Sequence, residues 1–406
     1  MIKTINKKYQ QQLMQIKEQC QEASKKLKKA FQEGAAIKID NKEIMIIYKY
    51  ISCLQFSNIY QLSNQVHQEV ETAQINRHLY QPNYKIVDQQ LIEIYINLLK
   101  EFINDICYQV DKFKQEKESV LFIVTKTYHD YKAYSYWLYK IFYYLDNNFT
   151  SYSWTSLGAI SISLFKQEYF DKFNKLILNT IFQFIYETRK YGILLNKQIK
   201  QLIELYSIMG SKEVELKYIR ESGQYYYISK KQEDAQRFYK EQFQSHLLTE
   251  TSKYYKNEID DKLNLTTTEF INWANSIFKL EQDMCLECYQ ISQQALKNKF
   301  KLILVSDQAA RLIDSPTGLG YMLKYDQTDE LKLLFKFLIQ NQECIIYISK
   351  YFEQKGQLLN NSFENQEQIE QQKNEAELYF TNILLFMEKA QDIFLNQLEK
   401  EPDVQR

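Results

Sequence analysis

The chain has 406 residues, of which 45% are hydrophobic and 15% aromatic, and its 51 basic residues balance 51 acidic ones. This composition is too apolar for a disordered chain, and its balanced charge creates no net field that would hold it to nucleic acid or to an anionic membrane. With 8 Gly and 3 Pro, the chain also lacks the turn residues that a sheet protein of this length needs. We therefore predict a folded, soluble, mainly helical protein of two or three domains.

Apolar residues at helical spacing recur along the chain. Residues 3–32 are rich in Lys and Gln, and their apolar positions predict an amphipathic helix with a solvated outer face. Later stretches place apolar side chains on one helix face: Leu91, Tyr95, Leu98, Phe102, Ile106 and Val110; Tyr239, Phe243, Leu247 and Tyr254; and Leu331, Leu334, Phe335 and Leu338. No segment shows sustained alternation of apolar and polar residues, so we predict an all-α fold.

Helix boundaries can be predicted at several points. Thr266, followed three residues later by Glu269, fits a capping box at the start of a helix. Gly192, Gly210 and Gly223 follow periodic stretches, where a left-handed C-terminal cap favours glycine, and so they are predicted to end helices. Residues 314–318 predict a turn, and the polar run 354–372 predicts a loosely held connection.

Motifs that carry chemistry are weak in this sequence. Cys285 and Cys288 form one CxxC, but no second pair is near enough to supply the four ligands of a zinc site, so we interpret them as two buried small residues. The four histidines are far apart in sequence and outside any recognisable nucleophile motif: His67, His78, His129 and His246. Gly318-Leu319-Gly320 lacks the third glycine of a dinucleotide loop. We expect no enzyme activity, no cofactor, no metal and no disulfide.

Tyrosine-dense stretches occur at residues 131–144 and 225–227. Such rings can stack on nucleic-acid bases, but basic residues do not interleave them densely, so helix packing or a protein interface is the favoured interpretation. No window approaches the roughly 20 apolar residues of a membrane span. The expected partners are therefore proteins, with no nucleic acid and no membrane.

Several segments resemble the cullin family in order and spacing. In FYKEQFQSHLLTETSKYYKNEIDDKL, residues 238–263, a Tyr-x-x-x-Phe and a Leu-Leu precede Thr-x-x-Tyr-Tyr, as in cullins. Residues 118–149 are similar to a second cullin stretch, and residues 268–280 are similar to the start of the family's third repeat. Further single residues match the family pattern: Ile185, Arg189, Gly192, Ile199, Leu323, Asp326, Asp329, Glu330, Leu331, Leu334 and Phe335. In the second stretch Asp130-Tyr131 stands for the family's Asp-Tyr, and Tyr128 stands for its Trp. The resemblance covers about residues 41–357.

This resemblance implies an elongated stalk of three tandem five-helix repeats. We expect an N-terminal helix with repeat 1 at residues 1–155, repeat 2 at 156–275, and repeat 3 with a C-terminal helix at 276–406. Polar details depart from the family, since Lys166-Gln167 replaces its Arg-Asp. Because the chain ends at Arg406, the half of a cullin that holds the RING subunit is expected to be absent.

The resemblance, closest to the Skp/F-box-type cullins, further implies a docking surface on the second and fifth helices of repeat 1. By register, the residues of this surface are Ile44, Met45, Tyr48, Ser52, Tyr136, Tyr139, Lys140 and Tyr143. The expected partner is a Skp-like or BTB-type adaptor with its F-box-type receptor, in the cytoplasm or nucleus. Alternatively, Ile44 and Tyr48 are core residues. A further alternative is that the chain is a structural module of a larger cytoskeletal or ciliary assembly.

Overall fold

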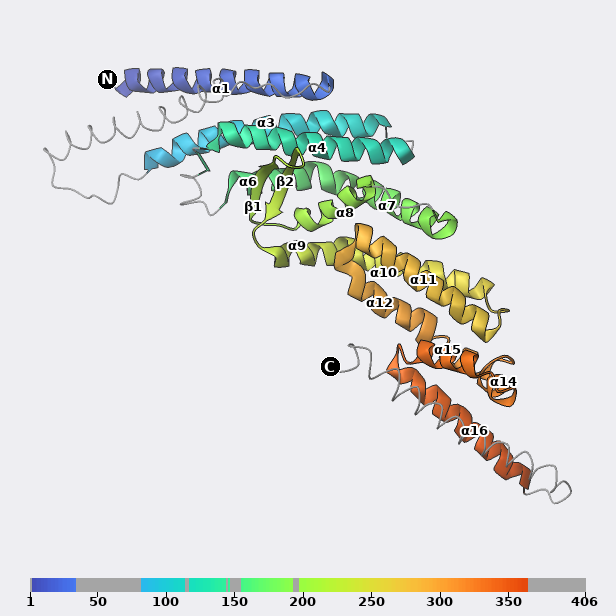
Figure 1. The fold of residues 1–406 in the computed structure, drawn as a ribbon. Helices are drawn as coiled ribbons and strands as arrows, with labels where there is room; N and C mark the ends of the chain where they lie inside the picture. The colour runs from blue at the N-terminus through green and yellow to red at the C-terminus, as the bar shows by residue number, and fades with distance from the viewer. Residues whose placement is uncertain are drawn as a thin grey trace, which may run out of the picture. The chain divides into compact units, whose positions relative to one another are not determined.

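The computed structural model describes residues 2–33, 82–113, 117–143, 145–146, 155–192 and 197–363, and the chain forms two compact units, residues 1–244 and 245–406. Among these described residues, helices make up most of the fold, and one two-stranded hairpin is the only sheet (Figure 1). The predicted all-α fold is therefore confirmed. The elongated stalk, its three five-helix repeats and their boundaries stay predictions.

The first unit is built around helix α4, Lys117–Ile141. Its other elements are α1 (Ile2–Glu33), α3 (Pro82–Phe113), α6 (Leu157–Phe165), η1 (Lys166–Phe170), α7 (Asp171–Tyr191), α8 (Lys197–Met209), β1 (Val214–Ile219), β2 (Gln224–Ser229), α9 (Gln232–Tyr239) and η2 (Lys240–Gln244). Helices α1 and α3 lie beside α4, which also contacts α6, α7, α8 and both strands (Figure 1). Helix α4 is enclosed on most of its circumference, because both Val120–Leu121 and Ile123–Val124 are buried.

Stacked aromatic rings form the core of this unit. The rings of Phe102 and Tyr134 are 4.1 Å apart and nearly parallel. Phe165 stacks on Tyr131 at 4.5 Å and on Tyr169 at 4.6 Å. Because each ring is fully or almost fully buried, the series joins α3, α4, α6 and η1 through large apolar contacts.

The buried tyrosines can serve as core residues because their hydroxyls are hydrogen-bonded. Tyr131 donates to the Ser161 carbonyl at 2.6 Å, and Tyr95 donates to the Leu157 carbonyl at 3.1 Å. Leaving such a buried hydroxyl without an acceptor would cost roughly 1 to 3 kcal/mol. These bonds tie α3 and α4 to α6, and they account for part of the high tyrosine content.

Two of the three π-helical turns among the described residues lie within long helical runs. The turn η1 lies between α6 and α7, and η2 lies between α9 and α10, Ser245–Asp261. At η1 both Tyr169 and Phe170 are buried, so the wider turn adds an aromatic residue to the core. Beyond η2 the buried face continues through Leu247 to Tyr255, whereas the sequence pattern predicts Tyr254.

The second unit continues from α10 into further helices. These are α11 (Thr267–Cys288), η3 (Gln290–Ser292), α12 (Gln293–Phe300), the π-turn η4 (Lys301–Ser306), α13 (Ala309–Asp314), α14 (Leu319–Lys324), α15 (Thr328–Leu338), η5 (Gln342–Cys344) and α16 (Ile345–Phe363). The predicted capping box at Thr266 and Glu269 is confirmed, and the predicted break falls between α13 and α14. The predicted loose connection is wrong for residues 354–363, which continue α16, and its remainder lies outside the described residues.

Three glycines are predicted to end helices. Gly192 and Gly210 follow helices, for different reasons, and Gly223 does not. Gly192 is the left-handed cap of α7, with φ 69°, as predicted. Gly210 follows α8 without a left-handed backbone, and a Cβ there would come within 2.3 Å of the Cβ of Phe238. Gly223 is not at a helix end, because it lies in the turn of the hairpin with φ 64°. Helix caps and tight hairpin turns both favour glycine with a positive φ.

We expect Gly192→Ala to lower the free energy of unfolding by about 1 to 2 kcal/mol, because an L-residue is strained in the left-handed region. A Cβ at this position would meet nothing within 4 Å, so strain rather than a clash sets the size of the effect. Urea unfolding of the variant measures it. Gly192→Asn is the control and should cost less, since Asn tolerates this conformation. Equal losses for the two variants would contradict the explanation.

Candidate docking surface

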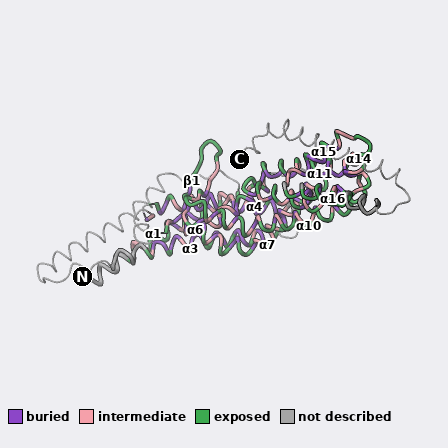
Figure 2. The backbone as a smooth tube through the Cα atoms, turned by 90° about the horizontal axis from the view of Figure 1, so that it is seen from below, coloured by how far each residue is buried: buried purple, intermediate pink, exposed green. Residues whose placement is uncertain are grey.

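The β1–β2 hairpin packs on the C-terminal half of α4. Strands β1 and β2 are antiparallel, and Leu216 pairs with Tyr227 in a buried position. The Tyr227 hydroxyl donates to Ser135 Oγ on α4 at 2.6 Å, and Trp137 Nε1 donates to the Tyr225 hydroxyl at 3.1 Å. These two bonds fix the hairpin on α4. The tip, residues 217–223, is exposed and projects from the helices (Figure 2).

A buried lysine adds a further contact between α4 and the hairpin. Lys132 of α4 is only 8% exposed, and its Nζ lies 4.7 Å from the ring centre of Tyr128 and 5.5 Å from that of Tyr226. Burial lowers the pKa of Lys132, while the charge of Glu204 acts in the opposite direction. The two ring faces attract the ammonium group and so connect β2 to α4.

Aromatic side chains of the hairpin and of α4 meet at the surface. The Tyr136 ring lies 5.1 Å from Tyr225 and 6.2 Å from Tyr218, and the latter two rings are 4.9 Å apart. Tyr218 is 42% exposed, whereas Tyr136 is half-buried beneath the hairpin. Three rings from two elements therefore form one continuous aromatic patch.

The patch continues past the C-terminal end of α4. Lys140 is exposed, and its Nζ lies 5.4 Å from the ring centre of Tyr136 and 5.9 Å from that of Tyr143. Tyr143, 42% exposed, meets the half-buried Tyr139 edge-on at 5.7 Å. We call Tyr136, Tyr139, Lys140, Tyr143, Tyr218 and Tyr225 the aromatic surface.

Asp146 anchors the end of this surface. Its Oδ1 accepts a hydrogen bond from the Leu157 backbone N–H at 2.7 Å, which fixes the chain that enters α6. Burial raises the pKa of Asp146, although this bond and one from Tyr139 act in the opposite direction. Burial also raises the pKa of Tyr139, and the nearby Asp146 charge adds to that shift. Asp146 therefore lies close to Tyr139 and also fixes the start of α6.

The predicted docking residues fall into two groups. Tyr136, Tyr139, Lys140 and Tyr143 lie together on the aromatic surface. The other predicted residues, Ile44, Met45, Tyr48 and Ser52, lie outside the described residues. Tyr218 and Tyr225 were not predicted to belong to the site. The tyrosine run at 225–227 and the alternation of Val214, Leu216 and Tyr218 with polar residues were the signals that could have revealed them.

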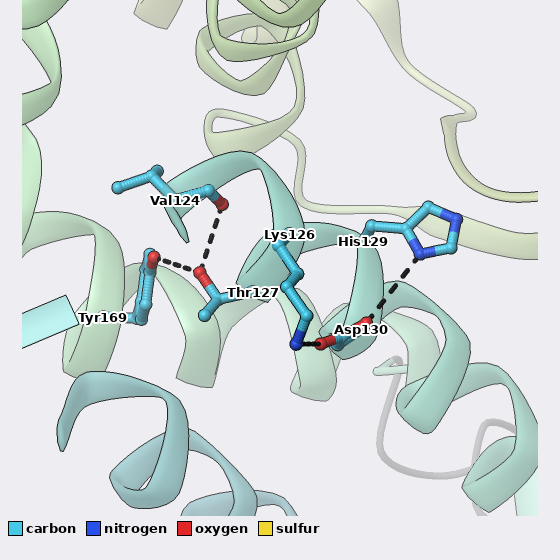
Figure 3. A network of polar contacts seen from close by, with 6 residues as sticks. All are labelled: Val124, Lys126, Thr127, His129, Asp130 and Tyr169. Carbon is cyan, nitrogen blue, oxygen red and sulfur yellow. Dashed lines mark hydrogen bonds and ion pairs between the residues drawn. The ribbon is translucent and has the colours of Figure 1, made fainter. Parts of the chain in front are cut away.

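The Asp130-Tyr131 pair, which carries part of the family resemblance, lies elsewhere on α4. Figure 3 shows Lys126 Nζ donating to Asp130 Oδ2 at 3.1 Å and His129 Nδ1 4.0 Å from Asp130 Oδ1. On the neighbouring turn, Thr127 Oγ1 lies 2.6 Å from the Tyr169 hydroxyl and also donates to the Val124 carbonyl (Figure 3). The Asp130 contacts lie within α4, whereas Thr127 connects α4 to η1.

The CxxC pair of the sequence lies in the second unit. Cys285 and Cys288 are both buried in α11. Within the described part of the chain, no cluster of three or more His, Cys, Asp or Glu side chains is placed to hold a metal ion. None of the described helices is both long enough and apolar enough to cross a membrane. The aromatic surface is therefore the site that the described residues support best.

Most of the chain matches the model of a known family. A family model described as the cullin alpha-solenoid domain matches residues 38–406, which is most of the chain. No curated protein matches the chain.

Proposed function

Because the chain belongs to the cullin family, we propose that it is a non-catalytic scaffold that binds a Skp-type or BTB-type adaptor through its first repeat. Cullin membership implies a scaffold with protein partners in ubiquitin-ligase assemblies. The adaptor class, the F-box-type receptor that it would bring and the docking residues are our proposal. Among the adaptor classes, the sequence resemblance favours the Skp type.

The aromatic surface is the observation that supports this proposal. Exposed tyrosines supply large contact areas at low conformational cost, and they are enriched among the residues that dominate protein interfaces. Tyr143 and Tyr218 are both 42% exposed, yet each ring packs against another ring of the surface. Such prior packing lowers the entropy lost on binding.

The chemistry of the surface defines the partner that would fit it. Tyr143 and Tyr218 need apolar pockets, and the exposed Lys140 beside Tyr143 favours a carboxylate at the rim of the pocket for that ring. Salt should weaken the lysine contribution, because this charge lies in solvent rather than in a buried pair. We therefore propose an adaptor with an apolar groove bordered by acidic residues.

Calorimetric titration of the full chain with a purified Skp-like adaptor, and separately with a BTB-type adaptor, tests the proposal. We expect the Skp-like adaptor to bind and the BTB-type adaptor to bind more weakly. Preference for the BTB-type adaptor would contradict the proposed class but keep the scaffold. Binding of neither adaptor to a chain with a helical circular-dichroism spectrum would overturn the proposed docking function.

A further inference from the structure

A cavity in the second unit lies between α11 and α12, near Gln340. Its volume is about 250 Å³. Drug-sized ligands occupy pockets of roughly 300 to 1,000 Å³, whereas an engineered cavity of about 150 Å³ accepts benzene. The cavity is therefore of the size for one amino-acid side chain or a small metabolite.

A buried carboxyl group forms part of the cavity wall. Glu281 of α11 is only 2% exposed and lines the cavity. Its Oε1 accepts a hydrogen bond from the Tyr255 hydroxyl at 2.7 Å. Because water is largely excluded at this position, an electrostatic interaction with the carboxylate is stronger than it would be at the surface.

The tyrosine that donates to Glu281 is one of three aromatic rings in contact with one another. The Tyr255 ring packs edge-on against Phe300 at 5.5 Å, and Phe300 packs edge-on against Phe278 at 6.0 Å. Phe278 and Phe300 both line the cavity. Aromatic ring faces attract cations, and their apolar surface accommodates an alkyl stem.

Among the described residues that line the cavity, Lys297 is the single cation, and it lies on the exposed side of α12. The inner wall of the cavity, which contains Glu281 and the aromatic rings, therefore favours a positively charged ligand. A ligand with one cationic end and an uncharged stem therefore fits better than an anion at the inner wall, which Glu281 would repel.

We propose that this cavity binds an alkylguanidinium or alkylammonium group, with Glu281 as counter-ion and Phe278 and Phe300 around the stem. The group can belong to a free small molecule or to an Arg or Lys side chain of a partner. The inference is independent of adaptor docking, because all of its residues belong to the second unit, whereas the aromatic surface belongs to the first.

Titration of the full chain with butylguanidinium, butylammonium and the uncharged control butylurea tests the charge preference. We expect both cations to bind and butylurea to bind at least about tenfold more weakly, as a lost charged hydrogen bond implies. A peptide with one internal arginine then distinguishes the sources. Tighter binding of the peptide than of butylguanidinium points to a partner side chain, and weaker binding points to a free cation.

Two variants test whether the charge of Glu281 determines the affinity for the cation. Glu281→Gln keeps an acceptor for Tyr255 but removes the charge, and it should weaken butylguanidinium binding roughly 10-fold to 100-fold. Lys297→Met removes a like charge at an exposed position and should strengthen binding about two- to threefold, with unchanged thermal unfolding. Unchanged affinity in a folded Glu281→Gln variant, or equal binding of butylurea, would overturn the proposal.

Discussion

Replacing Lys140 and Tyr143 together with alanine should weaken adaptor binding by about 2 to 4 kcal/mol, which is roughly 30-fold to 1000-fold. Both residues are exposed, Lys140 in the last turn of α4 and Tyr143 just beyond it, and they form one cation–ring contact. A few aromatic and cationic residues supply most of the free energy at such interfaces, so the loss should appear in affinity rather than in folding. Calorimetry with the adaptor measures the affinity.

A matched control for this pair exists on α7. Tyr186 and Lys190 also form an exposed cation–ring contact, with Lys190 Nζ 5.6 Å from the ring centre. Their double replacement with alanine should leave adaptor binding unchanged. The single variant Tyr218→Ala tests the hairpin, and it should weaken binding by about tenfold or more. If the Lys140/Tyr143 double variant and the Tyr218→Ala variant both bind like the wild type, the aromatic surface is not the docking site.

Phe165→Ala should lower the free energy of unfolding of the first unit by about 3 to 5 kcal/mol. The Phe165 ring is fully buried, and it stacks on both Tyr131 and Tyr169. Its removal leaves a cavity at the junction of α4, α6 and η1. This loss is a large part of the roughly 5 to 15 kcal/mol that stabilises a typical domain. Urea unfolding followed by circular dichroism measures the change.

Phe122→Ala is the control for the core variant. Phe122 also lies in the first unit, on α4, but is 57% exposed. Its removal should change the free energy of unfolding by less than about 0.5 kcal/mol, which is typical of surface positions. Similar losses in the two variants would show that the ring stack is not the main stabilising contact of this region.

The helices could be predicted because their periodicity is long and their caps are local. The six apolar residues from Leu91 to Val110 all lie buried on α3, and the Thr266 capping box is formed as expected. A period of 3.6 residues over several turns is the strongest signal in a single sequence. The polar run at 354–363 carries no such signal, and it is nevertheless helical in α16.

The hairpin escaped prediction because each of its strands is short. Val214, Leu216 and Tyr218 alternate with polar residues over six positions, which is too brief to stand out within a helical sequence. Its stability comes from tertiary contacts, such as the bond from Tyr227 to Ser135, whose partners are 92 residues apart. The π-turns likewise depend on packing, since nothing in the local pattern separates Tyr254 from Tyr255.

Half of the predicted docking residues could be predicted because their positions depend on local spacing along a helix. Tyr136, Tyr139, Lys140 and Tyr143 follow from their spacing on one helix, which the family resemblance supplied. The contribution of Tyr218 and Tyr225 requires knowledge that a distant segment folds back onto α4. A single sequence records spacing along a helix but does not record such a long-range contact.

The π-turns η1, η2 and η4 also determine where the chain tolerates changes of length. In a regular α-helix, loss of one residue rotates everything downstream by about 100° and moves core side chains to the surface. A π-turn already holds one extra residue, so deletion of a residue there can restore α-helical winding and leave both flanks in phase. Single-residue deletions should therefore be least harmful at exposed positions of these turns, such as Gln167, Glu241 and Leu302.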